Sequence, residues 1–242
     1  MSVRTPRLND FGQPIGPDLP GWTPRPQPTR TPMVGRQVRL EPLETKRHAR
    51  ELFEADRNSE DAADWTYLPN EPMYELADYE AWCAGASVTS DPLFFAIIDL
   101  KSGSAIGRAA FMRIDATNGV MEVGHIKFSP LLQRSALATE AMFLMMRRAF
   151  DELGYRRYEW KCDDLNEPSK RAARRLGFIF EGLFRNAVVV KGRSRDTAWF
   201  SIIDSEWPKL RAAFEHWLAP ENFSADGAQK ESLSKMIEEA RR

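Results

Sequence analysis

The sequence predicts an α/β domain in which helices cover both faces of a mixed β-sheet. Two observations lead to this prediction. Segments with the alternating pattern of strands are interspersed with segments whose apolar residues recur at helical spacing. Their order along the chain is β-α-α-β-β-β-α-β-α-β-β, which is typical of a mixed sheet with helices on both sides.

The first half of this domain combines two helices with four strands. Residues 37–41 alternate like an edge strand, and Pro42 ends it. The turn 101–103 (Lys-Ser-Gly) and the pair Asn118-Gly119 are typical of hairpin connections. The expected elements are a strand at 37–41, helices at 44–56 and 78–86, and strands at 93–100, 105–114 and 120–128.

In the second half, glycines mark the ends of the helices. A long amphipathic helix is expected to end at Gly154 and a shorter one at Gly177, because glycine readily takes the left-handed conformation that follows a helix. The expected elements are helices at 137–153, 166–176 and 207–218, and strands at 155–162, 178–190 and 195–203.

The chain divides into three regions. Half of the sixteen prolines lie between Pro6 and Pro32, which excludes a helix interior or a central strand there. This arm is either an extended leader or is held across a groove by Phe11, Ile15, Leu19 and Trp22. The expected division is a proline-rich N-terminal arm at 1–35, the folded domain at 36–219 and a polar C-terminal tail at 220–242, which can be helical over 229–241.

Composition excludes several classes of protein. The 34 Lys and Arg residues nearly balance the 35 Asp and Glu residues, so the charge does not favour nucleic acid or an anionic membrane as a partner. No apolar run approaches the ~18 residues that a membrane helix needs, and the N-terminus lacks a secretion signal. Two cysteines and three histidines give no metal-ligand spacing. We therefore expect a soluble cytoplasmic protein without a metal cofactor.

The most informative local feature is the turn that connects strand 120–128 to helix 137–153. Its sequence from Gln133 to Ala141 is Gln-Arg-Ser-Ala-Leu-Ala-Thr-Glu-Ala. A turn that opens a helix can direct several unpaired amides and the positive helix end at one anion, such as a phosphorylated cofactor. Ala136 stands where such turns prefer glycine. Its methyl group is tolerated if φ is negative and strains the turn if φ must be positive.

Three segments make residues 38–208 resemble the GNAT superfamily of N-acetyltransferases, and within it the RimJ/RimL-like branch. The first runs from 121–126 into 133–141, where the family pattern is Gln/Arg-x-x-Gly-x-Gly/Ala. The second is 166–169 (Asn-Glu-Pro-Ser), with 176–178 and 181–182 downstream. The third is 195–202, which ends in 206–208 (Glu-Trp-Pro). The resemblance implies a GNAT-like, mostly antiparallel sheet of six to seven strands and an N-acetyltransferase that uses acetyl-CoA.

The resemblance also implies how acetyl-CoA is held. The strand before the turn separates from its neighbour at a bulge, and its backbone pairs with the pantetheine arm. The pyrophosphate lies on the amides from Arg134 to Thr139, Asn166 faces the arm near the thioester, and Arg171 approaches the nucleotide phosphates. The implied cofactor contacts are Ile126, Lys127, Phe128, Gln133, Arg134, Ser135, Ala136, Leu137, Ala138, Thr139, Asn166 and Arg171.

Acetyl transfer to an amine needs a base, a donor to the oxyanion and an acid for the leaving thiolate. Glu122 matches the strand glutamate of the branch and is the candidate base; the alternative is a carboxylate paired with an arginine. Ser169 is the candidate acid, because Ala173 stands where the family often has a tyrosine; the alternative is a helix-capping role. The oxyanion donor is expected to be an amide near Lys127 or Phe128. Strand alternation places His125 on the face opposite Glu122.

Three aromatic residues and one basic cluster are the candidates for contact with the acceptor. Trp65, Tyr67 and Trp199 either line an acceptor pocket or pack in the core. The basic cluster 191–195 is expected to be a solvated hairpin tip; the alternative is that it guides an acidic or phosphorylated acceptor.

The predicted function is direct transfer from acetyl-CoA to a primary amine, which is a small metabolite or a protein N-terminus. A small molecule is favoured because no strongly acidic groove is evident. The alternative is a non-catalytic GNAT-fold module that binds CoA or a nucleotide and acts through a partner. A homodimer is compatible with the arm and the hairpin.

Overall fold

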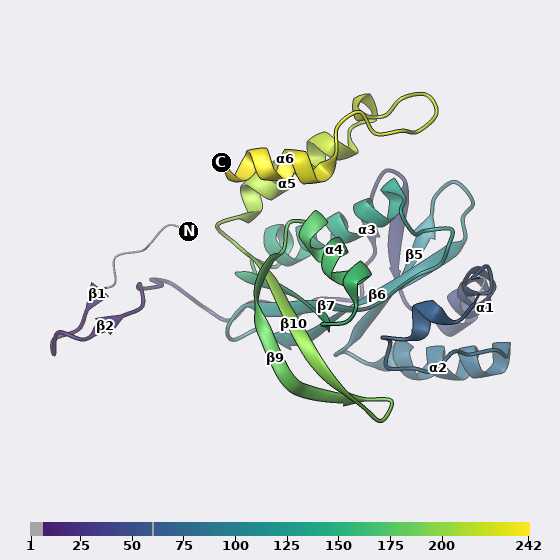
Figure 1. Ribbon diagram of the computed structural model, residues 1–242, viewed down its shortest axis with the longest axis horizontal. Helices are drawn as coiled ribbons and strands as arrows, with labels where there is room; N and C mark the ends of the chain where they lie inside the picture. Colours follow the sequence, from purple (N-terminus) through teal and green to yellow (C-terminus); the bar gives the residue numbers. More distant parts are fainter. Residues whose placement is uncertain (1–6, 60) are drawn as a thin grey trace.

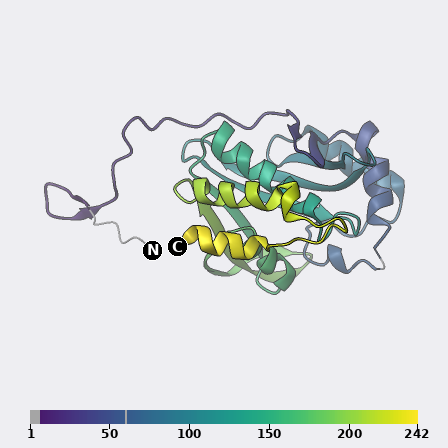
Figure 2. The same ribbon diagram turned by 90° about the horizontal axis from the view of Figure 1, so that it is seen from above.

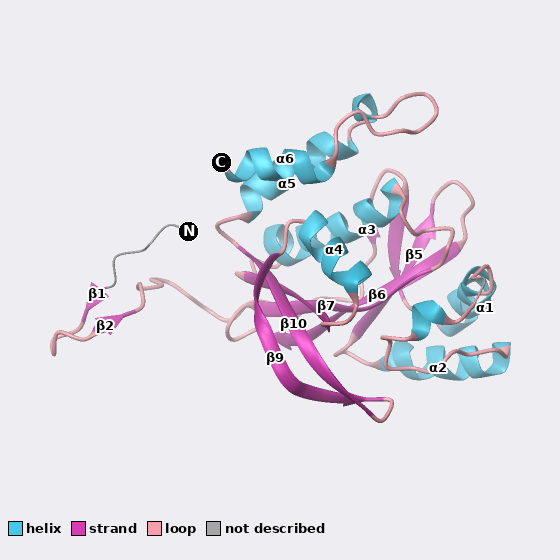
Figure 3. Cartoon of the chain, in the orientation of Figure 1, coloured by secondary structure: helices cyan, strands magenta, loops and turns pink. Residues whose placement is uncertain are grey.

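A single sheet of eight strands organises the computed structural model, which describes residues 7–59 and 61–242 (Figures 1 and 3). The strand order is β3-β4-β5-β6-β7-β8-β10-β9, and neighbours are antiparallel except for the parallel pair β7 and β8. The mixed, mostly antiparallel sheet is as predicted. The strands are β3 Met33–Val34, β4 Val38–Pro42, β5 Leu93–Asp99, β6 Ala105–Asp115, β7 Val120–Phe128, β8 Arg157–Asp163, β9 Ile179–Val190 and β10 Arg193–Ile203. The sheet has more strands than the six to seven expected, because it includes β3, a two-residue strand that directly follows the proline-rich segment.

Helices cover both faces of the sheet, as the sequence predicted. On one face, α1 (Thr45–Asp56) and α2 (Leu76–Val88) pack over β5 and β6; we call this the α1–α2 face. On the other, the α3 face, lie α3 (Ala136–Arg147), which continues in a π-helical turn at Arg148–Glu152, α4 (Glu167–Arg175) and α5 (Trp207–Leu218). Successive residues of β5 serve the two cores, since Phe94 packs under α1 and α2 and Phe95 under α3.

The C-terminal segment differs from the expected polar tail. Helix α6 (Leu233–Arg241) lies beside α5 on the α3 face, and its Leu233, Met236 and Ile237 are buried in the main core (Figures 1 and 2). These three apolar residues recur at helical spacing within a polar sequence, so a narrow stripe suffices to bury one side of the helix. Residues 233–241 therefore belong to the folded domain.

The N-terminal arm has two parts. Residues 7–20, with the short strands β1 (Arg7–Leu8) and β2 (Pro14–Ile15), extend away from the body, and Phe11 is 87% exposed (Figures 1 and 2). Trp22 instead docks on the body, where its indole Nε1 donates to the carbonyl of Thr117 over 3.0 Å. Gly119 beneath it has a φ of +63°, and a Cβ there would lie 2.6 Å from the Trp22 ring. Of the four expected anchors, Trp22 makes this contact.

The feature that positions the functional site is the separation of β7 from β8. The two strands pair over only four residues each, Val120–Val123 with Arg157–Trp160. Beyond this point β7 continues to Phe128 and β8 to Asp163, and the ladder between them has ended. A gap therefore opens in the middle of the sheet, and it exposes one backbone edge of each strand.

Candidate functional site

A cavity of about 510 Å³ occupies this gap and has walls from both faces of the sheet. On the α1–α2 face its lining includes Glu122, Lys161, Thr197 and Trp199, and from the α3 face it includes Cys162 and Ser169. A molecule in the cavity can therefore contact side chains on both sides of the sheet. The candidate base Glu122 and the candidate acid Ser169 both line it.

A bulge in β7 changes the orientation of His125. His125 and Ile126 lie opposite the single residue Ala109 of β6, and His125 has a φ of +50°. The His125 ring lies 5.1 Å from the ring of Phe94, on the α1–α2 face that Glu122 also occupies. The prediction that His125 faces away from Glu122 is therefore wrong, because the extra residue of the bulge shifts the alternation. Burial lowers the pKa of His125, and the nearby cations Arg108 and Arg113 lower it further.

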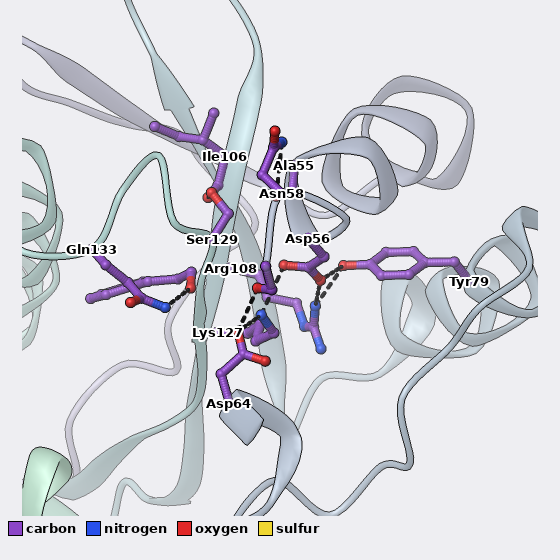
Figure 4. Close-up of polar contacts among 12 residues, drawn as sticks. Ala55, Asp56, Asn58, Asp64, Tyr79, Ile106, Arg108, Lys127, Ser129 and Gln133 are labelled. Carbon is purple, nitrogen blue, oxygen red and sulfur yellow. Dashed lines mark hydrogen bonds and ion pairs between the residues drawn. The ribbon is translucent and has the colours of Figure 1, made fainter. Parts of the chain in front are cut away.

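A buried ionic network holds the segment after the bulge (Figure 4). The Lys127 side chain is 2% exposed, and its ammonium lies 3.1 Å from a carboxylate oxygen of Asp56 and also pairs with Asp64. Arg108 lies 3.4 Å from the same Asp56 and donates to the hydroxyl of Tyr79. Burying these charges is tolerated because each has an opposite charge or a hydrogen-bond partner. The network fixes the end of β7 against α1 and the loop before α2.

The strand register shows which backbone groups of β7 face the gap. The amide of Ser129 donates to Ile106 in β6, and strand alternation therefore directs the amide of Lys127 toward β6 as well. The amides of Ile126 and Phe128 point the other way, to the open edge. Of the three expected pantetheine contacts, Lys127 thus offers no backbone group to the gap. Of the two expected oxyanion donors, Phe128 has its amide on the open side.

The conformation of the turn before α3 shows whether the methyl group of Ala136 strains it. The left-handed residue is Arg134, with a φ of +56°, whereas Ala136 is the first residue of α3. The N-cap is Ser135, whose hydroxyl accepts from the amide of Ala138 over 3.1 Å. The amides of Ala136 and Leu137 in the first helical turn have no intrahelical partner. Ala136 packs against the main core. Because it lies in the helix, its methyl group introduces no backbone strain that a glycine would remove.

Gln133 and Thr139 flank the free amides of this turn. The side chain of Gln133 donates to the carbonyl of Phe128 over 2.9 Å and ties the turn to β7. The hydroxyl of Thr139 accepts from the guanidinium of Arg175 over 3.0 Å. Arg175 lies on α4, one helical turn after Arg171 on the same side, and burial lowers its pKa. Arg171, the arginine expected from the sequence near the phosphates, is exposed, and Arg175 was not predicted although it lies only four residues later.

Glu122 is buried in a cluster of charges on the α1–α2 face. Its Oε2 lies 3.0 Å from the ammonium of Lys161 and 3.2 Å from the guanidinium of Arg113. Both cations contact Oε2, which leaves Oε1 as the oxygen that can accept a proton. Burial raises the pKa of Glu122, and Lys161 and Arg113 oppose that effect. The two sequence-based interpretations of Glu122 are therefore compatible, since the same carboxylate is paired and lines the cavity.

Lys161 is a site residue that sequence reasoning missed. Its ammonium is buried, lies 2.7 Å from Glu159 as well as 3.0 Å from Glu122, and sits 3.7 Å from the centre of the Trp199 ring. The signal was present in the sequence 157–163, Arg-Tyr-Glu-Trp-Lys-Cys-Asp, in which every second residue is charged. Alternation places these charges on one face of β8. The partner Glu122 could not be identified because it comes from another strand.

The start of α4 contributes Asn166 and Ser169. Asn166 is the N-cap, since its Oδ1 accepts from the amide of Ser169 over 3.1 Å. The capping role considered for Ser169 thus belongs to Asn166. The hydroxyl of Ser169 accepts from the indole of Trp160 over 2.9 Å, and a hydroxyl so fixed can still donate its own proton. Burial raises the pKa of the neighbouring Cys162, which disfavours a thiolate nucleophile.

The three aromatic residues considered for the acceptor pocket occupy different places. Trp65 is buried under α1 and α2, where Arg108 and Lys127 lie over its ring, and it packs in the core. Tyr67 lines the cavity and donates from its hydroxyl to the carbonyl of Leu165 over 3.1 Å. Trp199 lines the cavity and stacks on Phe184 with ring centres 4.3 Å apart.

The tip of the β9–β10 hairpin reaches the loop before α2. The ammonium of Lys191 donates to the carbonyl of Trp65, and Arg193 donates to the carbonyl of Thr66, each over 3.0 Å. The expectation of a solvated hairpin tip is therefore wrong for Lys191, whose side chain is 11% exposed, and holds for Arg193, which is exposed although it also reaches a carbonyl of the loop. The hairpin spans one side of the cavity.

Neither a metal-binding cluster nor a membrane-spanning helix is present among the described residues. Within residues 7–59 and 61–242, no three His, Cys, Asp or Glu side chains come together in a way that could hold a metal ion. In the same ranges, no helix has the length and apolar character needed to cross a bilayer.

Comparison with known proteins identifies the family of the domain. A family model described as an acetyltransferase (GNAT) domain matches residues 37–179. A crystal structure of a GCN5-related N-acetyltransferase from Brucella melitensis is 53% identical, with a TM-score of 0.89 over 91% of this chain and 100% of that one. A probable acetyltransferase of the GNAT family from Chromobacterium violaceum ATCC 12472 is 40% identical, with a TM-score of 0.75 over 81% of this chain and 98% of that one.

The curated relatives are more distant. The putative ribosomal N-acetyltransferase YdaF of Bacillus subtilis (strain 168) is 28% identical over 108 residues, which are 45% of this chain and 58% of that protein. The chain spans less than two thirds of the length of the curated relatives that it matches.

Proposed function

The chain belongs to the acetyltransferase (GNAT) family. We propose that it lies in the RimJ/RimL-like branch and transfers an acetyl group from acetyl-CoA directly to a primary amine. The observation that carries this proposal is the cavity in the gap between β7 and β8, because Glu122 and Ser169 both line it. The acceptor is a small amine or a protein N-terminus. The docked hairpin tip supports the small amine, since it leaves less room for a folded partner.

The residues beside the gap fit acetyl-CoA. The open amides of Ile126 and Phe128 can pair with the amide groups of a pantetheine arm. The free amides of Ala136 and Leu137, at the positive end of α3, can bind a pyrophosphate. Arg175 beside this turn, and Arg171 one helical turn away, add positive charge for the phosphates. Asn166 lines the cavity at the start of α4 and has its side-chain amide free to donate.

Bound acetyl-CoA supplies a thioester whose carbonyl carbon can be attacked by a neutral amine. We assign Glu122 as the base, because its pKa is raised by burial and its Oε1 is free to take the amine proton. As the C–N bond forms and the C–S bond breaks, the hydroxyl of Ser169 can give its proton to the departing sulfur. The amide of Phe128 can donate to the carbonyl oxygen. Balance requires that Ser169 regain a proton from solvent afterwards.

The test of Glu122 is the variant Glu122→Gln, with thiol release from acetyl-CoA measured against pH. We expect kcat/KM at neutral pH to fall roughly 10²- to 10⁴-fold, because a positioned base is worth that much. Activity should recover in part at high pH, where free amine accumulates. The matched control is Glu80→Gln, an exposed position of α2 that we expect to be neutral. Unchanged activity of Glu122→Gln would remove Glu122 as the base.

The same assay separates an enzyme from a binding module. Saturable binding of acetyl-CoA without thiol release across a panel of amines and peptides would favour a non-catalytic module that acts through a partner. The buried, partly neutralised carboxylate of Glu122 in the cavity supports the enzyme instead.

A homodimer and a cytoplasmic location remain proposals. Support for the dimer comes from the apolar side chains of Leu8, Phe11 and Leu19, which are exposed on the extended arm, and of Leu183 and Val189, which are exposed on the edge strand β9. A second copy that covers them would double the mass measured by light scattering in solution. Support for the location comes from Cys83 and Cys162, which are free thiols.

A further inference from the structure

Three side chains of β10 form one wall of the cavity. Arg195, Thr197 and Trp199 alternate along the strand, so they project from the same face. Trp199 lies over Lys161, and Lys161 contacts the candidate base Glu122. The Trp199 end of the wall is therefore the end next to the proposed reaction. Arg195 lies at the other end of the wall, four residues along the strand. The mechanism proposed above uses neither Arg195 nor Thr197.

Two buried polar atoms of this wall have no hydrogen-bond partner among the described residues: Nε of Arg195 and Oγ1 of Thr197. Thr197 is 3% exposed and lines the cavity. Unpaired buried polar groups are uncommon in folded proteins because each costs about 1–3 kcal/mol. Since both atoms belong to residues of the cavity wall, a molecule in the cavity can supply the missing partners.

The charges in the cavity show which kind of group is missing. Of its three cations, Lys161 and Arg113 are both paired with Glu122. The third, Arg195, has no ion-pair partner within the described ranges 7–59 and 61–242. Asp163, which also lines the cavity, accepts the amide of Leu165 at its Oδ1 over 2.9 Å and forms no ion pair with Arg195 among the described residues. The unmatched charge in the cavity is therefore a guanidinium, which binds a carboxylate well.

We propose that Arg195 and Thr197 bind a carboxylate of the acceptor, so that the substrate is an amine that also carries a carboxylate. This inference rests on the proposed acetyl transfer and names the class of its acceptor. Arg195 is four residues from Trp199, roughly 13 Å along the strand. The amine and the carboxylate must therefore be several bonds apart, as in an ω-amino acid or a short peptide with a free C-terminus. The single positive charge of Arg195 and the hydroxyl donor of Thr197 match one carboxylate, which carries a single negative charge.

The experiment compares acceptors that differ only in the carboxylate. The pairs are 6-aminohexanoate with 6-aminohexanamide, and glycylglycine with its C-terminal amide. KM and kcat are measured by thiol release from acetyl-CoA, and binding of 6-aminohexanoate is measured by calorimetry. The variants are Arg195→Gln and Thr197→Val, and the control is Arg185→Gln, which removes an exposed arginine of β9 outside the cavity lining.

We expect the wild type to prefer the carboxylate in at least one pair. Arg195→Gln should raise KM for that acceptor roughly 10- to 100-fold, with kcat and KM for acetyl-CoA little changed, because a hydrogen bond to a charged group is lost. Thr197→Val should also raise KM for the carboxylate acceptor. Neither variant should change KM for the amide acceptors, and the control Arg185→Gln should leave KM for the carboxylate acceptor unchanged. Equal use of both members of each pair by the wild type would overturn the inference. So would an equal loss with both members in Arg195→Gln.

Failure of the proposed function gives a different result. If no amine releases thiol, the acetyl-transfer proposal fails and calorimetry decides the inference alone. Binding of 6-aminohexanoate that weakens in Arg195→Gln then supports a carboxylate site. Absence of binding, or binding unaffected by Arg195→Gln, contradicts it.

Discussion

Removal of the Lys161 ammonium is the sharpest test of the buried charge cluster. This ammonium lies 3.0 Å from Glu122 and 2.7 Å from Glu159, two carboxylates that are 4% and 6% exposed. In Lys161→Met both acids lose a shared cation, and only Arg113 and Arg157 remain to oppose their charges. Removing one partner of a buried ion pair costs about 3–5 kcal/mol, because the other charge stays buried. At roughly 2–4 °C per kcal/mol for a chain of this size, Tm should fall by about 6–20 °C.

The deficit should depend on pH in a defined direction. Without Lys161, the pKa of Glu122 in the folded protein rises further, because burial already raises it and one of the cations that oppose this effect is lost. A group whose folded pKa lies above its unfolded value stabilises the fold at low pH and loses that contribution as pH rises. The difference in unfolding free energy between wild type and Lys161→Met should therefore shrink as pH falls from 7 toward 5. The assay is urea unfolding followed by tryptophan fluorescence at each pH.

Two controls isolate the cause. Lys161→Met combined with Glu159→Gln should recover much of the loss, since it removes one of the two facing carboxylates. Lys235→Met, a matched change at a lysine whose side chain is 59% exposed, should stay within about 0.5 kcal/mol of wild type. If Lys161→Met were as stable as wild type at pH 7, or if its loss of stability grew on acidification, Lys161 would not be stabilising the two buried carboxylates.

Three further predictions concern the scaffold. Ala136→Gly should lower the unfolding free energy by about 0.5–1 kcal/mol, because Ala136 already has a helical conformation. The affinity for acetyl-CoA, measured by calorimetry, should stay unchanged. A marked gain in affinity would show that the methyl group obstructs the cofactor. Glu140→Gln should cost about 1–3 kcal/mol in urea unfolding, since the Glu140 carboxylate accepts from the three consecutive amides of residues 36–38; a neutral result would remove this anchor of β4. Gly119→Ala should release Trp22 and make the arm more sensitive to limited proteolysis, because a Cβ at 119 would lie 2.6 Å from the ring; unaltered cleavage would contradict the docking.

Local patterns predicted much of what surrounds the gap. The strand–turn–helix unit ending in α3 has a fixed sequence signature, and Ser135 and Asn166 are residue types that cap helices, so these could be located directly. Glu122 followed from the family pattern. The fold class followed from the order of elements, which depends on periodicity within each segment.

The features that the sequence could not predict depend on contacts between distant segments. His125 faces the cavity side because of a single-residue bulge, and alternation alone does not reveal one. Lys161 meets Glu122 only through the register of the parallel pair β7 and β8. The docking of Lys191 depends on a carbonyl in a loop 126 residues away in sequence. A helix over 229–241 was considered from the sequence, but the packing of α6 in the core was not predicted, because its apolar stripe is narrow.

In the proposed reaction, the gap between β7 and β8 holds acetyl-CoA next to Glu122, so that an amine in the cavity is acetylated. The most direct measurement is a titration of the full chain with acetyl-CoA by calorimetry, followed by assay of free thiol when the amine panel is added. We predict saturable binding with one site per chain, and thiol release that depends on both the amine and Glu122. Absence of acetyl-CoA binding would contradict the proposed acetyl transfer.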